Sequence, residues 1–201
     1  MGKRRTTLNW RTVVVAALCT FLLTAPASTP AQAAELAGVT MADSIKIGGE
    51  ESSLVGMGIR KKTIIKVYVA GLYMENPSKD AAIIIGTDQA RGMVMHFVYK
   101  KVKAKSLQKG WRDGFDANTP DRSGDLAERM EQFENMFTEP LLRGERVLMT
   151  YTPGEGTTVV IKNDNKGTIP GADFAEALFA IWFGKKPADK GLKKKILAEG
   201  K

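Results

Sequence analysis

Residues 54–75, LVGMGIRKKTIIKVYVAGLYME, join a Gly-x-Gly sequence and a single arginine to a long run of strand-forming residues. Gly56 and Gly58 allow close backbone approach and the positive φ values of a tight entry. β-Branched and aromatic residues dominate the following segment, which predicts a strand over Thr63–Glu75. Arg60 is therefore expected immediately before a strand. Its guanidinium either binds an anion beside the sheet or remains in solvent, as most arginines do.

The first 33 residues have the three parts of a secretory signal peptide. Four basic residues lie before or at the start of an apolar stretch, Val13–Leu23, and Ala31 and Ala33 form a small-x-small cleavage site. The apolar stretch is shorter than the roughly 20 residues of a membrane span. We therefore expect residues 1–33 to be removed and residues 34–201 to form a periplasmic or secreted domain. An uncleaved membrane anchor is the alternative.

Removal of residues 1–33 from the 201-residue chain would leave 168 residues, which suits a single domain. Cys19, the only cysteine, would leave with the signal peptide, so disulfides and thiolate metal sites are excluded. The net charge would fall from +8 to +4. The remaining lysines cluster at 100–105 and 193–195, which is typical of solvated faces and compatible with weak contact to an anionic membrane surface. No stacking aromatics interleave them, so no nucleic-acid partner is expected.

Periodicity and turn residues place strands and helices in separate blocks along the rest of the chain. The expected strands are Val39–Thr40, Ser44–Ile47, Ser53–Leu54, Thr63–Glu75, Arg91–Lys100, Arg146–Thr152, Thr157–Lys162 and Gly167–Ile169. The expected helices are Lys79–Ile85 with Ser78 as its N-cap, Lys105–Ala117, Gly124–Phe137, Ala172–Phe183 and Leu192–Ala198. Ala172–Phe183 is apolar nearly all round, which predicts a buried helix or one that also lines a cavity. The pattern indicates an α+β fold whose antiparallel sheet is covered on one face by helices.

The order of these motifs resembles the chalcone isomerase superfamily and, more narrowly, its exported bacterial chalcone isomerase-like branch. The resemblance spans residues 38–198 and is most specific over Gly56–Tyr73 and Gly167–Gly184. It implies an open-faced β-sandwich, in which a large antiparallel sheet is layered by helices. In the plant enzymes the substrate cleft lies between that sheet and two helices, which match Lys105–Ala117 and Ala172–Phe183 here.

The resemblance also implies two uses for Arg60. In the plant enzymes, which close chalcones to flavanones, the matching arginine stabilises an anion, and Tyr68 matches a strand threonine. Their cleft helix carries a tyrosine and an asparagine that hold a catalytic water, and Lys105–Asp116 contains neither. The plastid fatty-acid-binding members instead use the arginine with a tyrosine to hold a carboxylate. Arg60 with Tyr68 or Tyr73 is similar to that second arrangement.

The leading hypothesis is a periplasmic, non-enzymatic binding protein that holds a small amphipathic carboxylate, such as a fatty acid, in a cleft between sheet and helices. An intramolecular lyase acting on an enone, with Arg60 and Tyr68 as catalytic residues, is the alternative. A structural or partner-binding factor with a filled cleft is the third. The candidate ligand contacts are Arg60, Tyr68, Tyr73, Trp111, Phe115, Leu178 and Trp182.

No cofactor or metal is expected from the remaining residues. His96 is the only histidine, and its position in a Met/Val/Phe strand predicts a core residue rather than a general base. The carboxylates near residues 113–125 are scattered over a helix and a turn, which is typical of solvated or capping side chains. The oligomeric state is left open.

Overall fold

Seven antiparallel strands form one large sheet in the order β11-β10-β9-β6-β5-β4-β3. The computed structural model describes residues 1–2 and 33–198. The strands of this sheet are β3 (Ser44–Ile47), β4 (Glu50–Lys62), β5 (Ile65–Met74), β6 (Arg91–Phe97), β9 (Arg146–Thr152), β10 (Gly156–Ile161) and β11 (Asp164–Ile169). Two small two-stranded antiparallel sheets complete the β structure: the hairpin of β1 (Ala34–Leu36) and β2 (Val39–Met41), and the pair of β7 (Lys101–Val102) and β8 (Leu141–Leu142), which are distant in sequence.

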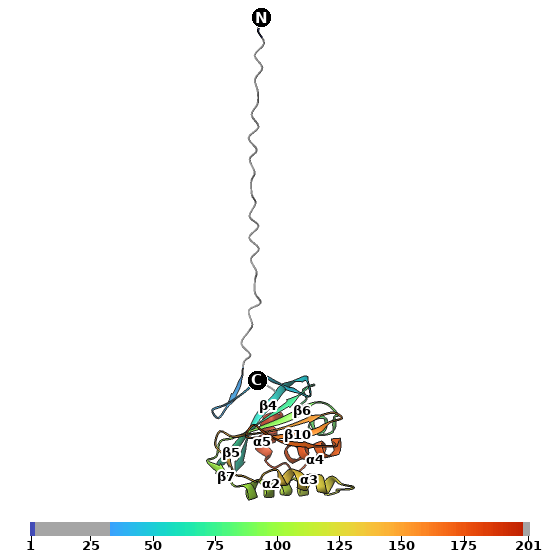
Figure 1. The fold of residues 1–201 in the computed structure, drawn as a ribbon. Coiled ribbons are helices and arrows are strands. Elements are labelled where there is room, and N and C mark those ends of the chain that lie inside the picture. The colour runs from blue at the N-terminus through green and yellow to red at the C-terminus, as the bar shows by residue number, and fades with distance from the viewer. Residues whose placement is uncertain (3–32, 199–201) are drawn as a thin grey trace. The chain divides into compact units, whose positions relative to one another are not determined.

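Helices cover one face of the sheet. They are α1 (Ala81–Gly86), α2 (Ala104–Asn118), α3 (Leu126–Asn135), α4 (Ala172–Phe183) and α5 (Lys190–Ile196). Figure 1 shows α2 and α3 side by side, with α4 between them and the strands. Nine of the twelve residues of α4 are buried, which confirms the prediction that this helix is buried. The predicted α+β fold, a large antiparallel sheet layered by helices, is therefore confirmed.

Side chains of β5 alternate between two apolar clusters, as the period of a strand requires. Tyr68 and Leu72 face the main core beneath the helices. Val69 faces the opposite side, where it packs with Val39 and Met41 of the β1–β2 hairpin. β5 is therefore covered on both faces, which explains why its residues 67–74 contain no charged side chain.

The Gly-x-Gly sequence lies inside a strand and not in a turn. Gly56, Gly58 and Arg60 all belong to β4, and neither glycine has a positive φ, so the predicted tight entry is wrong. The predicted close backbone approach is confirmed. A Cβ added to Gly56 would lie 2.5 Å from the carbonyl oxygen of Ile196, and one added to Gly58 would lie 2.8 Å from that of Leu192. The glycines therefore let the backbone of α5 pack directly on β4.

The short strands β1, β7 and β8 were not expected, and the other differences concern element ends. The N-cap of α1 is Asp80, whose carboxylate accepts from the backbone N–H of Ala82, and not Ser78 as expected. Within the described part of the chain, no helix has the length and apolar character needed to cross a membrane. The predicted signal peptide falls almost wholly on residues 3–32, outside the described residues, and stays a prediction.

Candidate functional site

Arg60 and Tyr68 are direct cross-strand neighbours in the β4–β5 pair, so their side chains share one face of the sheet. The register shifts between Arg60 and Lys61, where a bulge ends the regular pairing. Tyr68 is 7% exposed and belongs to the main core. Arg60 is half-buried. The strand pairing therefore brings together the two residues whose association the sequence suggested.

The Tyr68 hydroxyl is hydrogen-bonded to helix α4. Trp182 of α4 donates its indole N–H to the Tyr68 oxygen at 3.1 Å. Among the described residues, no acceptor is present for the Tyr68 hydroxyl proton. Burial raises the pKa of Tyr68, and the nearby positive charge of Arg60 only partly opposes this. The phenol therefore stays protonated at neutral pH and has a proton to donate.

The Arg60 guanidinium forms no hydrogen bond or ion pair with any described residue. A carboxylate is close in the fold, since Asp189 influences the Tyr68 hydroxyl electrostatically. That carboxylate is occupied elsewhere: it accepts from the backbone N–H groups of Lys61 at 2.8 Å and Leu192 at 2.9 Å. The planar set of N–H donors on the Arg60 guanidinium is therefore available to bind another partner.

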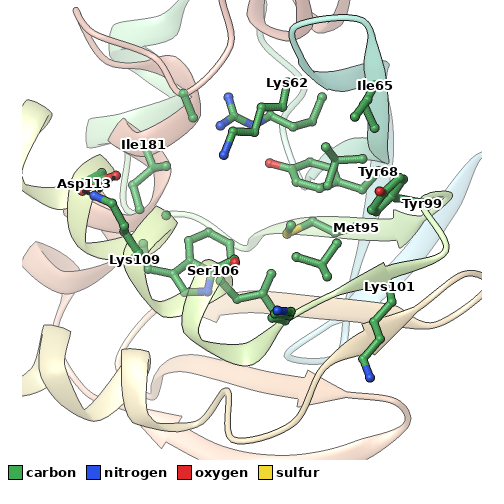
Figure 2. Close-up of a pocket in the computed structure, with 18 residues that line it drawn as sticks. Lys62, Ile65, Tyr68, Met95, Tyr99, Lys101, Ser106, Lys109, Asp113 and Ile181 are labelled. Carbon is green, nitrogen blue, oxygen red and sulfur yellow. Dashed lines mark hydrogen bonds and ion pairs between the residues drawn. The ribbon is translucent and has the colours of Figure 1, made fainter.

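Both side chains line a cavity of about 830 Å³ between the sheet, the segment that follows β6, and α2 (Figure 2). This volume is within the roughly 300–1,000 Å³ range of small-molecule sites. The apolar lining comes from Ile65, Val67, Met95, Val102, Leu107, Trp111, Ile181 and Ala188. The charged lining comes from Arg60, Lys62, Lys101, Lys103, Lys109 and Asp113. Asp113 is the only carboxylate among these lining residues, and it pairs with Lys109 at 2.8 Å.

The structure places the seven candidate residues in three different environments. Arg60, Tyr68 and Trp111 line the cavity. Phe115, Leu178 and Trp182 are buried in the core and do not line it, although Trp182 reaches it indirectly through its hydrogen bond to Tyr68. Tyr73 lies on the opposite face of the sheet, where it packs near Ile47 and donates to the carbonyl oxygen of Ala42 at 2.8 Å.

Trp111 carries a further polar group at the cavity wall. Its indole N–H is buried and has no acceptor among the described residues. Its ring packs edge-on against Trp182 with 5.6 Å between ring centroids, so the indole is held firmly in place. An N–H group in this state is costly unless an acceptor reaches it.

Sequence reasoning missed the lysines of the cavity. Lys101 and Lys103 belong to the 100–105 cluster, whose composition is typical of a solvated face, yet both line the cavity. Their position could have been inferred, because this segment connects a sheet strand to the cleft helix and must therefore pass the end of the cleft. Lys62 was missed because residues 60–62 were expected to precede a strand, whereas they end β4 and line or adjoin the cavity.

The arrangement favours binding of an anion with an apolar body. Arg60 and Tyr68 offer charged and neutral donors, while most other lining side chains are apolar or cationic. His96 does not line the cavity, and burial together with the charge of Arg146 lowers its pKa. Within residues 33–198, no group of histidine, cysteine and carboxylate side chains has the arrangement of a metal site.

Comparison with known proteins agrees with this architecture. A family model described as chalcone isomerase-like matches residues 33–198. The crystal structure of a fatty-acid binding protein from Arabidopsis thaliana is similar, with a TM-score of 0.63 and 19% sequence identity over 80% of this chain and 92% of that chain. At this identity the similarity shows the fold. No curated protein matches the chain.

Proposed function

The chain belongs to the chalcone isomerase-like family, and we propose that it binds a fatty-acid-like carboxylate in the cavity beside Arg60, without catalysing a reaction. The observation that carries the proposal is the pair of Arg60 and Tyr68 at an apolar cavity: within the described part of the chain, the arginine has no ion-pair partner and the tyrosine hydroxyl proton has no acceptor.

The charge of the cavity selects for an anion. Five lysine or arginine side chains line it, and its one carboxylate is already paired with Lys109. Removing a guanidinium from water costs free energy unless an anion compensates it. A ligand carboxylate would accept from the Arg60 guanidinium and from the Tyr68 hydroxyl together. Such charge-assisted hydrogen bonds are about twice as strong as neutral ones.

The rest of the cavity selects for an apolar body. Val67, Met95 and Leu107 contribute aliphatic and thioether surface, and Trp111 contributes an aromatic wall. Each buried methylene of an acyl chain would add about 0.8 kcal/mol. The structurally similar Arabidopsis protein is named as a fatty-acid binding protein, which supports the same ligand class here. A cavity of about 830 Å³ also speaks against a cleft filled by side chains.

The proposed location is the periplasm or the exterior of the cell. It is supported by the composition of residues 1–33, which have the charged, apolar and small-residue regions of a signal peptide.

Two measurements test the proposal. Mass spectrometry of organic extracts from the purified protein should detect a bound long-chain carboxylate. Calorimetric titration with dodecanoate should then give an affinity that Arg60→Ala weakens by roughly ten- to a hundredfold, because a hydrogen bond to a charged group contributes about 1.5–3 kcal/mol. Arg60→Lys should restore part of the loss, since an ammonium keeps the charge without the planar fork.

Arg146→Ala is the matched control, because Arg146 is exposed on β9, does not line the cavity and has no ion pair among the described residues. It removes the same charge and should leave the affinity unchanged. Equal affinities of the wild type and Arg60→Ala would refute the role of Arg60. Absence of any dodecanoate binding and of any extracted carboxylate would refute the proposed function.

A further inference from the structure

The turn between β4 and β5 exposes two large apolar side chains. Ile64 is 88% exposed and Ile65 is 44% exposed. Thr63 forms the corner of this turn with a left-handed φ of 57°. Isoleucine is among the residues most often buried, so two adjacent exposed ones give this hairpin an apolar tip.

Lysines surround these isoleucines. Lys61, Lys62 and Lys66 are exposed, and none forms an ion pair with a described residue. Residues 55–74 contain no aspartate or glutamate, so no acidic residue of this segment offsets their charge. We call residues 61–66 the hairpin tip.

A second group of cations lies on the other side of the cavity. Lys100, Lys101 and Lys103 are exposed and belong to residues 91–112, which also contain no acidic residue. Figure 2 shows Lys62 and Ile65 on one side of the cavity and Lys101 on the other. Lys62 and Ile65 of the tip and Lys101 and Lys103 of the second group therefore line the same cavity.

We propose that the hairpin tip docks on an anionic phospholipid surface. Ile64 would enter the boundary between headgroups and acyl chains, and the lysines on both sides of the cavity would contact the headgroups. A small apolar tip flanked by lysines suits this interface, because binding there combines buried apolar area with attraction to anionic lipid.

Docking would bring the cavity opening to the lipid surface, since Lys62 and Ile65 belong to the tip and also line the cavity. An amphipathic ligand could then pass between membrane and protein with little exposure to water. Only this consequence rests on the proposed function. The docking itself would hold for any ligand of the cavity.

A tryptophan at the tip reports insertion directly. Ile64→Trp is compared with Ile83→Trp, each after subtraction of the emission of the unsubstituted protein, which retains Trp111 and Trp182. Ile83 is 44% exposed on α1, which follows the other end of β5, roughly 30 Å along the strand. Vesicles of brominated phosphatidylcholine with phosphatidylglycerol should quench the added emission at position 64 and not at position 83. Equal quenching at both positions, or none at either, would overturn the docking.

The charge and apolar contributions are separated by sedimentation with vesicles of phosphatidylglycerol and phosphatidylcholine. Lys61→Ala and Lys66→Ala should each lower partitioning about fivefold, the effect of one lysine near an anionic surface. Lys46→Ala, on β3 near the opposite end of the sheet, should change nothing. Ile64→Ser should lower partitioning about tenfold. Unchanged partitioning of Ile64→Ser would overturn the proposal. Ile64 does not line the cavity, so dodecanoate titration of the same variant tests ligand binding separately.

Discussion

Gly56→Ala tests whether α5 packs on β4 through a contact that only glycine permits. The added Cβ would lie 2.5 Å from the carbonyl oxygen of Ile196 and 3.2 Å from the carbonyl carbon. Both are backbone atoms, so no side-chain rotation relieves the overlap and α5 must move away. Overpacking of this kind costs about 1–3 kcal/mol. Replacing glycine also lowers the entropy of the unfolded chain, which stabilises the variant by about 0.5–1 kcal/mol. The midpoints of these two ranges give a net destabilisation of about 1 kcal/mol, and the upper limit is about 2.5 kcal/mol.

Gly110→Ala is the same chemical change in an open position. Gly110 lies in α2, and a Cβ added there would have no atom of another element within 4 Å. This variant should be stabilised by up to about 1 kcal/mol through helix propensity. Urea unfolding of both variants gives the difference, and thermal unfolding should show shifts of roughly 2–4 °C per kcal/mol in opposite directions. A Gly56→Ala protein as stable as the wild type would refute the packing argument.

Three further outcomes are expected. Burial raises the pKa of Tyr73 and Tyr151 to about 12 from 10.0. The free energy of unfolding measured in urea should therefore be unaffected by these groups below pH 10 and should fall between pH 10 and about 12. A free energy of unfolding that stays constant over that range would contradict this. Naringenin chalcone should not cyclise above its solution rate in stopped-flow absorbance, and an acceleration that Arg60→Ala abolishes would restore the lyase hypothesis. Exported material should have the intact mass of residues 34–201, and a full-length species retaining Cys19 would contradict the signal peptide.

Most of the fold could be predicted because hydrophobic period and turn residues are local properties. The buried helix α4 was predicted with its observed bounds, Ala172–Phe183, since nearly every position in it is apolar. β4 could not be predicted as a continuous strand. Its glycines resemble those of a turn sequence. Glycine is needed at these positions because the backbone of α5, more than 130 residues further along the chain, packs directly against them. Local propensity carries no information about such a contact.

The candidate site could be predicted in part. Arg60 was selected from its neighbours in sequence, but its pairing with Tyr68 depends on the register of β4 and β5. Tyr73 could have been excluded from the site by the sequence alone, because it lies five positions after Tyr68 and an odd number of positions puts two strand residues on opposite faces. The lysines of the cavity are brought there by the path of the chain after β6, which periodicity does not describe.

The two outer strands of the sheet determine whether it grows by adding strands from other molecules. β3 is only four residues long and carries an exposed lysine, Lys46. β11 carries exposed Asp164 and Lys166, and its pairing with β10 is interrupted by a bulge between Val159 and Val160. Short length, charge and irregular pairing all oppose edge-to-edge association. The protein can therefore keep an unclosed seven-stranded sheet while its edges resist the ordered aggregation to which exposed strands are prone.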